Sequence, residues 1–135
     1  MKEIEKKLME FQILKAGYEQ LEAKEKELLE TKMEIEISIS AIKEVSSLEN
    51  SADVFVNFGA GNYIKGKIYA PEKILVSIGA GVVVEKSAEE AIKLMEERLK
   101  SIDDALDQIR NEREKIALKL EALREEIESG RKSEK

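Results

Sequence analysis

The chain has 135 residues, of which 39% are charged and only 4% aromatic, a composition that favours long solvated helices over a thick globular core. It contains neither cysteine nor histidine, which excludes disulfides, thiolate nucleophiles, imidazole bases and most zinc sites. The net charge is -6, and the two flanking segments carry the excess of acid: the charge is -4 over residues 1–50, +1 over 51–87 and -3 over 88–135.

Residues 1–50 carry the apolar rhythm of a coiled-coil helix. Apolar residues follow a rhythm of three and four, with steps of seven where one position is skipped, at Ile4, Phe11, Leu14, Tyr18, Leu21, Leu28, Ile35, Ile39 and Ile42. Glu25 and Lys32 interrupt this seam at heptad a positions. Further apolar residues lie partly off the seam, at Leu8, Met9, Ile13, Leu29, Met33 and Ile37. One narrow stripe over such a length predicts a helix that needs a partner helix beside it.

Residues 51–87 break from the helical period and read as β-structure. They hold the only proline and four short runs rich in Val, Ile, Phe and Tyr, at 54–58, 62–69, 73–78 and 82–86. The run 54–61 repeats as 74–81, and both copies end in Gly-Ala-Gly. Neither copy continues as a phosphate-binding loop, because the third glycine and the Gly-Lys-Ser/Thr sequence are missing. We therefore predict two tandem β-hairpins with glycine-rich turns.

Residues 88–128 form the second predicted helix, and 129–135 a flexible tail. Ser87 and Glu90 make a capping box at its start. The seam is more regular here and only Arg113 interrupts it; it comprises Ile92, Met95, Leu99, Ile102, Leu106, Ile109, Ile116, Leu120, Leu123 and Ile127. The two ladders match in length, which predicts an antiparallel two-helix coiled coil of the α+β class with two hairpins between its helices. Glu25 or Lys32 is expected to meet Arg113 across the seam.

The hairpins are expected to build an oligomer, because unpaired strand edges and a small apolar set seek a second subunit. The candidate oligomerisation residues are Val54, Val56, Phe58, Ile64, Ile74, Val76, Ile78 and Val83. The lysines near the strands are explained as well by edge protection as by a basic patch.

The free ends of the two helices are the candidate binding surface. In an antiparallel pair they meet at one tip, where no third layer covers them, and exposed apolar patches often mark binding sites. The candidate residues are Ile4, Leu8, Met9, Phe11, Ile13, Leu14, Leu118, Leu120, Leu123 and Ile127. An ordinary coiled-coil seam with frayed ends is the alternative interpretation.

The order helix, two hairpins, helix, with the exit segment 73–91 (KILVSIGAGVVVEKSAEEA), resembles the α-type subunit of prefoldin. The resemblance implies an ATP-independent chaperone without catalytic residues, cofactor or metal. It also implies that two α and four β subunits share a β-barrel body with coiled-coil arms. The arm tips would hold non-native proteins and deliver them to a group II chaperonin. Some members of the α class assemble with themselves instead.

Two rival functions stay open from the sequence. The first is a structural or filament-forming coiled coil without clients. The second is an RNA-binding arm, which the negative charge of both helices disfavours. Because the start of the chain has no apolar signal region and no apolar run approaches a membrane span, we expect a cytoplasmic protein that contacts neither membrane nor nucleic acid.

Overall fold

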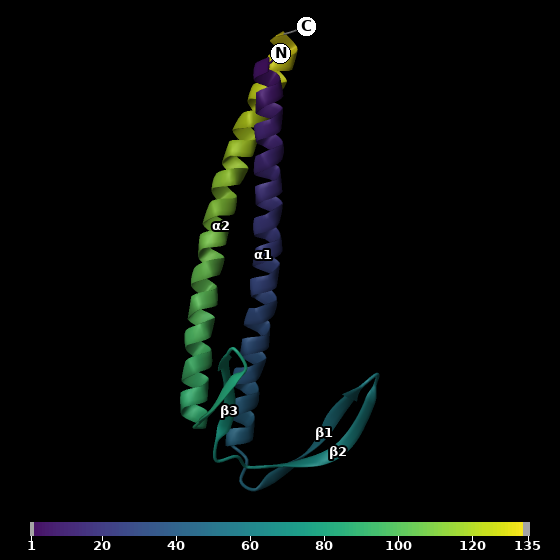
Figure 1. The fold of residues 1–135 in the computed structure, drawn as a ribbon, viewed down its shortest axis with the longest axis vertical. Coiled ribbons are helices and arrows are strands. Elements are labelled where there is room, and N and C mark those ends of the chain that lie inside the picture. The colour runs from purple at the N-terminus through teal and green to yellow at the C-terminus, as the bar shows by residue number, and fades with distance from the viewer. Residues whose placement is uncertain (1, 134–135) are drawn as a thin grey trace. The chain divides into compact units, whose positions relative to one another are not determined.

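The computed structural model describes residues 2–133 and divides into two compact units, one made of residues 1–32 and 101–135, the other of residues 33–100. The elements, in chain order, are α1 (Lys2–Ser46), β1 (Ser51–Gly59), β2 (Asn62–Tyr69), β3 (Ile74–Gly79), β4 (Val82–Lys86) and α2 (Ala88–Ser133) (Figure 1). This order confirms the predicted fold class of two long helices with two antiparallel hairpins between them. Within the described residues, neither helix has a stretch long and apolar enough to cross a membrane.

The first unit is a pair of antiparallel helices. The N-terminal part of α1 runs beside the C-terminal part of α2, so the start of α1 and the end of α2 lie at the same end of this unit (Figure 1). Its seam is made by predicted heptad residues of α2, of which Leu106, Ile109, Leu123 and Ile127 are buried. The side chain of Ile4 in α1 lies against Gly130 of α2. A Cβ atom added at Gly130 would come within 3.2 Å of the Ile4 side chain.

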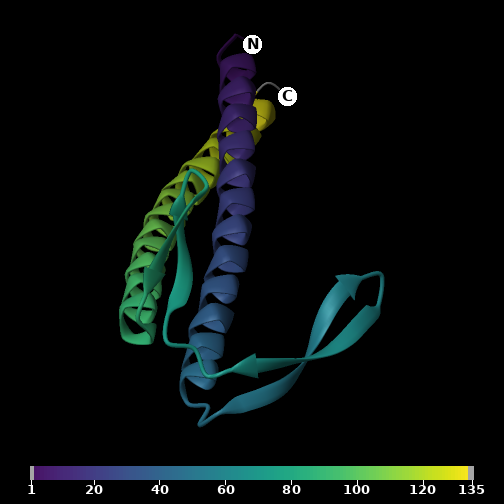
Figure 2. The same ribbon diagram turned by 60° about the horizontal axis from the view of Figure 1, so that its bottom comes forward.

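The second unit has a small core in which one hairpin packs on the helices. The buried residues of this core are Ile39 and Ile42 from α1, Val76 from β3, and Ala91 and Met95 from α2. Ile74 and Val84 of the same hairpin pack against this cluster. The β3–β4 hairpin therefore lies along the helices, whereas the β1–β2 hairpin projects away from them, as Figure 2 shows.

Both hairpins have the same turn. β1 pairs with β2 up to Gly59 opposite Asn62, and β3 pairs with β4 up to Gly79 opposite Val82. Each two-residue loop is Ala-Gly with both residues at positive φ, 50° at Ala60 and 78° at Gly61 in the first hairpin. Two positive φ values characterise the type I′ turn, whose twist matches that of the strands. The predicted turns are confirmed, although the pattern did not indicate that alanine adopts this conformation.

Local hydrogen bonds define the helix boundaries. The Ser87 hydroxyl accepts a hydrogen bond from the Glu90 backbone N–H at 3.2 Å, so Ser87 caps α2 as predicted. At the other end α2 continues past residue 128, where the predicted helix stops, and residues 129–133 are helical. Residues 134–135 of the predicted tail lie outside the described residues. α1 ends at Ser46, earlier than predicted, and β1 begins at Ser51 rather than Val54.

Candidate functional sites: the arm end and the hairpin faces

The end of the first unit brings together residues 4–11 and 124–131. Lys7 Nζ lies 3.6 Å from Glu126 Oε2 across the two helices. A shallow hollow of about 170 Å³ opens next to them, lined by Leu8, Phe11, Arg124, Ile127, Glu128 and Arg131. The structure thus places the two predicted clusters next to each other.

The ten candidate tip residues divide into three groups by exposure. Leu123 and Ile127 are buried in the seam. Five more are half-buried along its edges: Ile4, Leu8, Phe11, Leu14 and Leu120. Met9, Ile13 and Leu118 are largely exposed, at 64%, 68% and 68%. Only these three side chains therefore offer a mainly free apolar surface, while the buried pair serves helix pairing.

A charged cluster interrupts the seam further along the same unit. Arg113 Nη1 donates to Glu25 Oε1 at 2.9 Å, and Arg110 Nε donates to Glu25 Oε2 at 3.3 Å. The Arg113 guanidinium also lies 5.6 Å from the centre of the Tyr18 ring. This confirms the pairing of Glu25 with Arg113, whereas Lys32 pairs with Asp103 at 2.7 Å instead. Polar partners at a positions fix the register of a coiled coil at some cost in stability.

The cluster also changes the proton affinity of Glu25. Hydrogen bonding from Arg113 lowers the pKa of the Glu25 carboxyl below its ordinary value, and the charges of Arg113 and Arg110 lower it further. The same contact raises the pKa of Arg113. At neutral pH the cluster is therefore charged on both sides.

The two hairpins each have one apolar face. Residues that pair across the strands share a face, and alternate residues along a strand do as well. The apolar face of β1–β2 consists of Ala52, Val54, Val56, Ile64, Gly66 and Ile68. The matching face of β3–β4 carries Ile74, Val76 and Val84. That second face is the one that packs on the helices of its own subunit.

The eight candidate oligomerisation residues are consequently not equivalent. Val76 is 5% exposed and belongs to the core of its own subunit, so it does not offer a free surface to another one. Val54 and Ile74 are half-buried. The other five are exposed: Val56, Phe58, Ile64, Ile78 and Val83. A small hollow of about 220 Å³ separates the base of β1–β2 from the end of α1.

Several exposed apolar residues were not among the sequence candidates. On the hairpins they are Phe55, Tyr63, Ile68, Tyr69, Leu75 and Val82, and on α1 they are Leu29, Met33 and Ile37. Two-residue alternation from Ile64 and Val84 would have found Ile68 and Val82, whereas the other four hairpin residues lie on the opposite face of their strands. The α1 residues were noticed as off-seam, but nothing in a sequence states which side of a helix the hairpins leave uncovered.

Two long antiparallel helices joined by two β-hairpins that carry exposed apolar side chains define a coiled-coil protein of the α+β class. Comparison with known proteins identifies the family. The family model described as "Prefoldin subunit" matches residues 14–132, and the chain belongs to this family.

Curated relatives agree with this assignment. Prefoldin subunit alpha of Thermofilum pendens is 30% identical over 87% of this chain and 92% of the relative. That of Nitrosopumilus maritimus is 34% identical over 87% and 80%, and that of Pyrococcus horikoshii 36% over 78% and 72%. A cryo-EM structure of filamentous PFD from Methanocaldococcus jannaschii shares the fold, with a TM-score of 0.73 and 24% identity over 85% of this chain and 95% of that one.

Proposed function

We propose that this chain is a subunit of an oligomeric, ATP-independent chaperone that holds non-native polypeptides at the ends of its coiled-coil arms. Membership of the prefoldin family and similarity to alpha subunits support the chaperone class. The single observation that supports the site is the exposure of Met9, Ile13 and Leu118 near the end of the helix pair.

The physical reason is that an unfolded client exposes scattered apolar segments that no defined pocket fits. Shallow apolar patches on several arms bind such segments weakly one at a time. Because the arms belong to one body, the effective concentration rises and the combined affinity can gain a factor of roughly 10²–10⁴. A flexible methionine such as Met9 adapts to varied partners. Acidic residues around the patches keep the arms soluble.

The proposal includes the partners that the family resemblance implies. These are prefoldin β-type subunits, in a complex of two α and four β chains, non-native client proteins, and a group II chaperonin that receives the clients. Neither nucleotide nor cofactor takes part, the chain is not an enzyme, and the site of action is the cytoplasm. The absence of catalysis can be tested with the purified chain. If it hydrolyses ATP and a point substitution in the chain abolishes that hydrolysis, the chain is an enzyme and this statement is wrong.

The test of the tip site replaces the three exposed residues by serine in the assembled protein: Met9→Ser, Ile13→Ser and Leu118→Ser. We expect the mass of the particle and its helix content to stay unchanged, while its ability to prevent aggregation of a denatured test protein is lost. A control replaces two apolar residues of similar exposure outside this end, Met33→Ser and Ile37→Ser, and should keep the protection. If the triple variant protects as well as the original protein, the site lies elsewhere.

A second candidate function is a self-assembling filament. The likeness to a structure titled filamentous PFD and the exposed apolar residues of both hairpins favour it. A head-to-tail contact that does not close into a ring produces open fibres. Electron microscopy of this chain alone distinguishes the two candidates, since discrete particles support the chaperone and long fibres support the filament.

A further inference from the structure

Most of the aromatic side chains of this protein lie on the first hairpin, and all of those are exposed. The chain has three tyrosines and three phenylalanines, and four of these six belong to β1–β2. Their exposed fractions are 68% for Phe55, 70% for Phe58, 62% for Tyr63 and 71% for Tyr69. Aromatic residues are enriched in protein interfaces, and tyrosine is frequent among the residues that dominate binding.

The strand register places three of these rings on one face of the hairpin, together with two lysines. Cross-strand partners share a face, and so do alternate residues along one strand. The face in question carries Ser51, Asp53, Phe55 and Asn57 from β1, and Tyr63, Lys65, Lys67 and Tyr69 from β2. We define the aromatic–lysine face by Phe55, Tyr63, Lys65, Lys67 and Tyr69.

The aromatic–lysine face is the reverse side of the apolar face of β1–β2. Val54, Val56 and Ile64 belong to the apolar face and alternate with the aromatic and basic residues along the strands. An oligomer that covers the apolar face leaves the other face outermost, because a two-stranded sheet has only two faces. Beyond its base the hairpin also projects away from the helices (Figures 1 and 2), so within residues 33–100 no helix covers the rings.

The internal repeat shows that the two hairpins share one face and differ in the other. On the shared side the repeat keeps β-branched residues at three corresponding positions: Val54 and Ile74, Val56 and Val76, Ile64 and Val84. On the other side three corresponding positions change in character: Phe55 to Leu75, Tyr63 to Val83, and Lys65 to Glu85. The second hairpin forms without a ring or a lysine at these positions, so hairpin formation does not require them in the first.

Lys65 and Lys67 give this face a positive charge on an otherwise acidic chain. Residues 51–87 carry +1, whereas the flanking segments carry -4 and -3. Both lysines are exposed, and within residues 2–133 neither takes part in an ion pair, although Asp53 stands opposite Lys67 in the register. Counting Asp53, the face keeps one net positive charge. A partner that approaches the rings therefore meets positive charge here and negative charge on the helices.

From these observations we propose that the aromatic–lysine face is the docking site for an acidic, extended segment of a partner protein. Carboxylates of the segment lie at Lys65 and Lys67, and its apolar side chains lie on the rings of Phe55, Tyr63 and Tyr69. The exposed charge pairs orient the segment, while the rings supply most of the buried surface. This inference rests on the proposed function only in taking the apolar face as the one used for assembly.

Single-stranded nucleic acid is the other class of ligand that combines rings with lysines. Its binding depends mainly on phosphate contacts, and each lysine neutralises one phosphate. Two lysines beside one aspartate offer little of this, and the flanking helices, at -4 and -3, repel a polyanion. An acidic peptide needs only one or two carboxylates at the right places, which the face provides for. The charges therefore favour the peptide.

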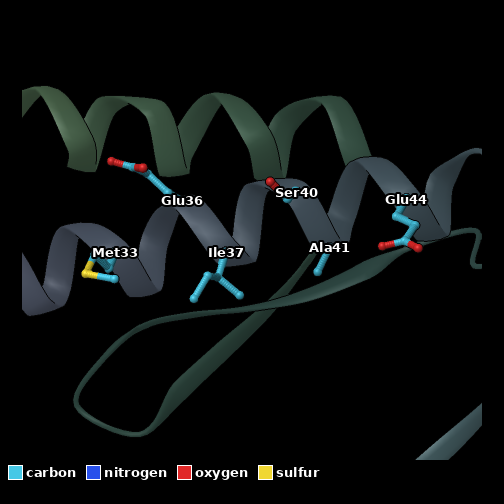
Figure 3. Close-up of a pocket in the computed structure, with 6 residues that line it drawn as sticks. All are labelled: Met33, Glu36, Ile37, Ser40, Ala41 and Glu44. Atoms are coloured by element: carbon cyan, nitrogen blue, oxygen red, sulfur yellow. The ribbon is translucent and has the colours of Figure 1, made fainter.

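Exposed apolar side chains alone do not make such a site, as a second surface of this protein illustrates. On α1, Met33 and Ile37, which are 64% and 66% exposed, lie on one side of the helix (Figure 3). An open hollow of about 470 Å³ at this place is lined by Met33, Glu36, Ile37, Ser40, Ala41 and Glu44. The lining contains two acids and no base, so it disfavours an acidic segment. This surface therefore serves as a control of similar exposure.

The binding test uses a short fluorescent peptide in which glutamate alternates with leucine and tyrosine. It is titrated against the assembled protein carrying Met9→Ser, Ile13→Ser and Leu118→Ser, so that binding at the arm ends is removed. We expect this peptide to bind roughly three- to tenfold more tightly than the same peptide with glutamine for glutamate, and added salt to reduce the difference. Equal binding of both peptides would overturn the proposal.

The repeat itself supplies the test variant. Phe55→Leu, Tyr63→Val and Lys65→Glu give the first hairpin the residues of the second, which this chain already accommodates in strands. We expect unchanged circular dichroism and particle mass, and a loss of affinity for the glutamate peptide of roughly tenfold or more. The control variant Met33→Ser, Ile37→Ser should bind as before. Unchanged peptide affinity after the exchange would refute the site, and a smaller particle would show that this face is a subunit contact instead.

Reversing the charges gives an independent readout. Lys65→Glu, Lys67→Glu should invert the preference, so that a peptide with lysine in place of glutamate binds more tightly than the glutamate peptide. Persistence of the original preference would contradict the assigned role of the two lysines. A labelled oligouridylate is the second probe. If it binds the original protein more tightly than the glutamate peptide does, nucleic acid is the ligand and the proposal is wrong.

A last comparison separates this inference from the proposed function. With intact arm ends, the variant Phe55→Leu, Tyr63→Val, Lys65→Glu should still prevent aggregation of a denatured test protein, because Met9, Ile13 and Leu118 are unchanged. Loss of protection together with loss of peptide binding would mean that the hairpin belongs to the client site and is no separate docking surface. Failure of the arm-end variant to lose protection contradicts the proposed function but leaves peptide binding at the hairpin as it was.

Discussion

Truncation to alanine should have very different effects on stability at two leucines of the same helix. Leu106 is 2% exposed and is the largest fully buried side chain among the described residues, whereas Leu118 is 68% exposed. Leu106→Ala removes three carbon atoms from the seam, a transfer cost of about 2.4 kcal/mol at about 0.8 kcal/mol per buried methylene. The cavity that remains adds to this, so we expect a loss of about 2–5 kcal/mol in the free energy of unfolding.

For Leu118→Ala the same arithmetic gives a much smaller loss. Only about a third of its surface is covered in the subunit, which limits the transfer term to about 0.8 kcal/mol. Alanine is also the best helix former, which offsets part of the loss. The stability of Leu118→Ala should therefore stay close to that of the original protein, while its capacity to hold a denatured client decreases.

The assay is denaturant unfolding followed by circular dichroism, with all three proteins at one subunit concentration because the stability of an oligomer depends on it. The transition of Leu106→Ala should shift to distinctly lower denaturant. A shift of the same size for Leu118→Ala would refute the reasoning, since it would mean that Leu118 is buried by another subunit rather than free to bind clients.

Three further predictions concern local structure. Ser87→Ala should lower the free energy of unfolding by about 1 kcal/mol, because the capping bond to Glu90 is lost, and denaturant titration would show it. Ala60→Asn should raise the melting temperature, since Asn-Gly suits the positive φ values of this turn, and an unchanged or lower temperature would argue against the type I′ assignment. Because the pKa of Glu25 is lowered in the folded state, its stabilising contribution is present above its unfolded pKa of about 4.3 and is lost as the pH falls through the lower folded value. The melting temperature of Glu25→Gln should thus lie below that of the original protein at neutral pH and approach it in strong acid; a constant difference would contradict this.

The sequence by itself determined the order and type of the elements. A seam repeating every three and four residues needs a second helix to bury it, so the spacing of Leu106 and Ile109 indicated the coiled coil. The Gly-Ala-Gly repeat indicated the two hairpins in the same way, because few residues tolerate the positive φ of such turns. Ser87 indicated where the second helix begins. All of these signals are local or periodic.

Only the tertiary structure decided which apolar residues are free. Val56 and Val76 occupy equivalent places in the repeat, yet one is 44% exposed and the other 5%, because only β3–β4 lies against the helices. Ile127 and Leu118 were both candidates for the tip, yet Ile127 is buried in the seam and Leu118 is exposed. Exposure depends on what packs from elsewhere in the chain, and a periodic pattern does not contain that information. For this reason the sequence could only propose candidate regions for binding and assembly, while the packing of the subunit separated the exposed residues of those regions from the buried ones.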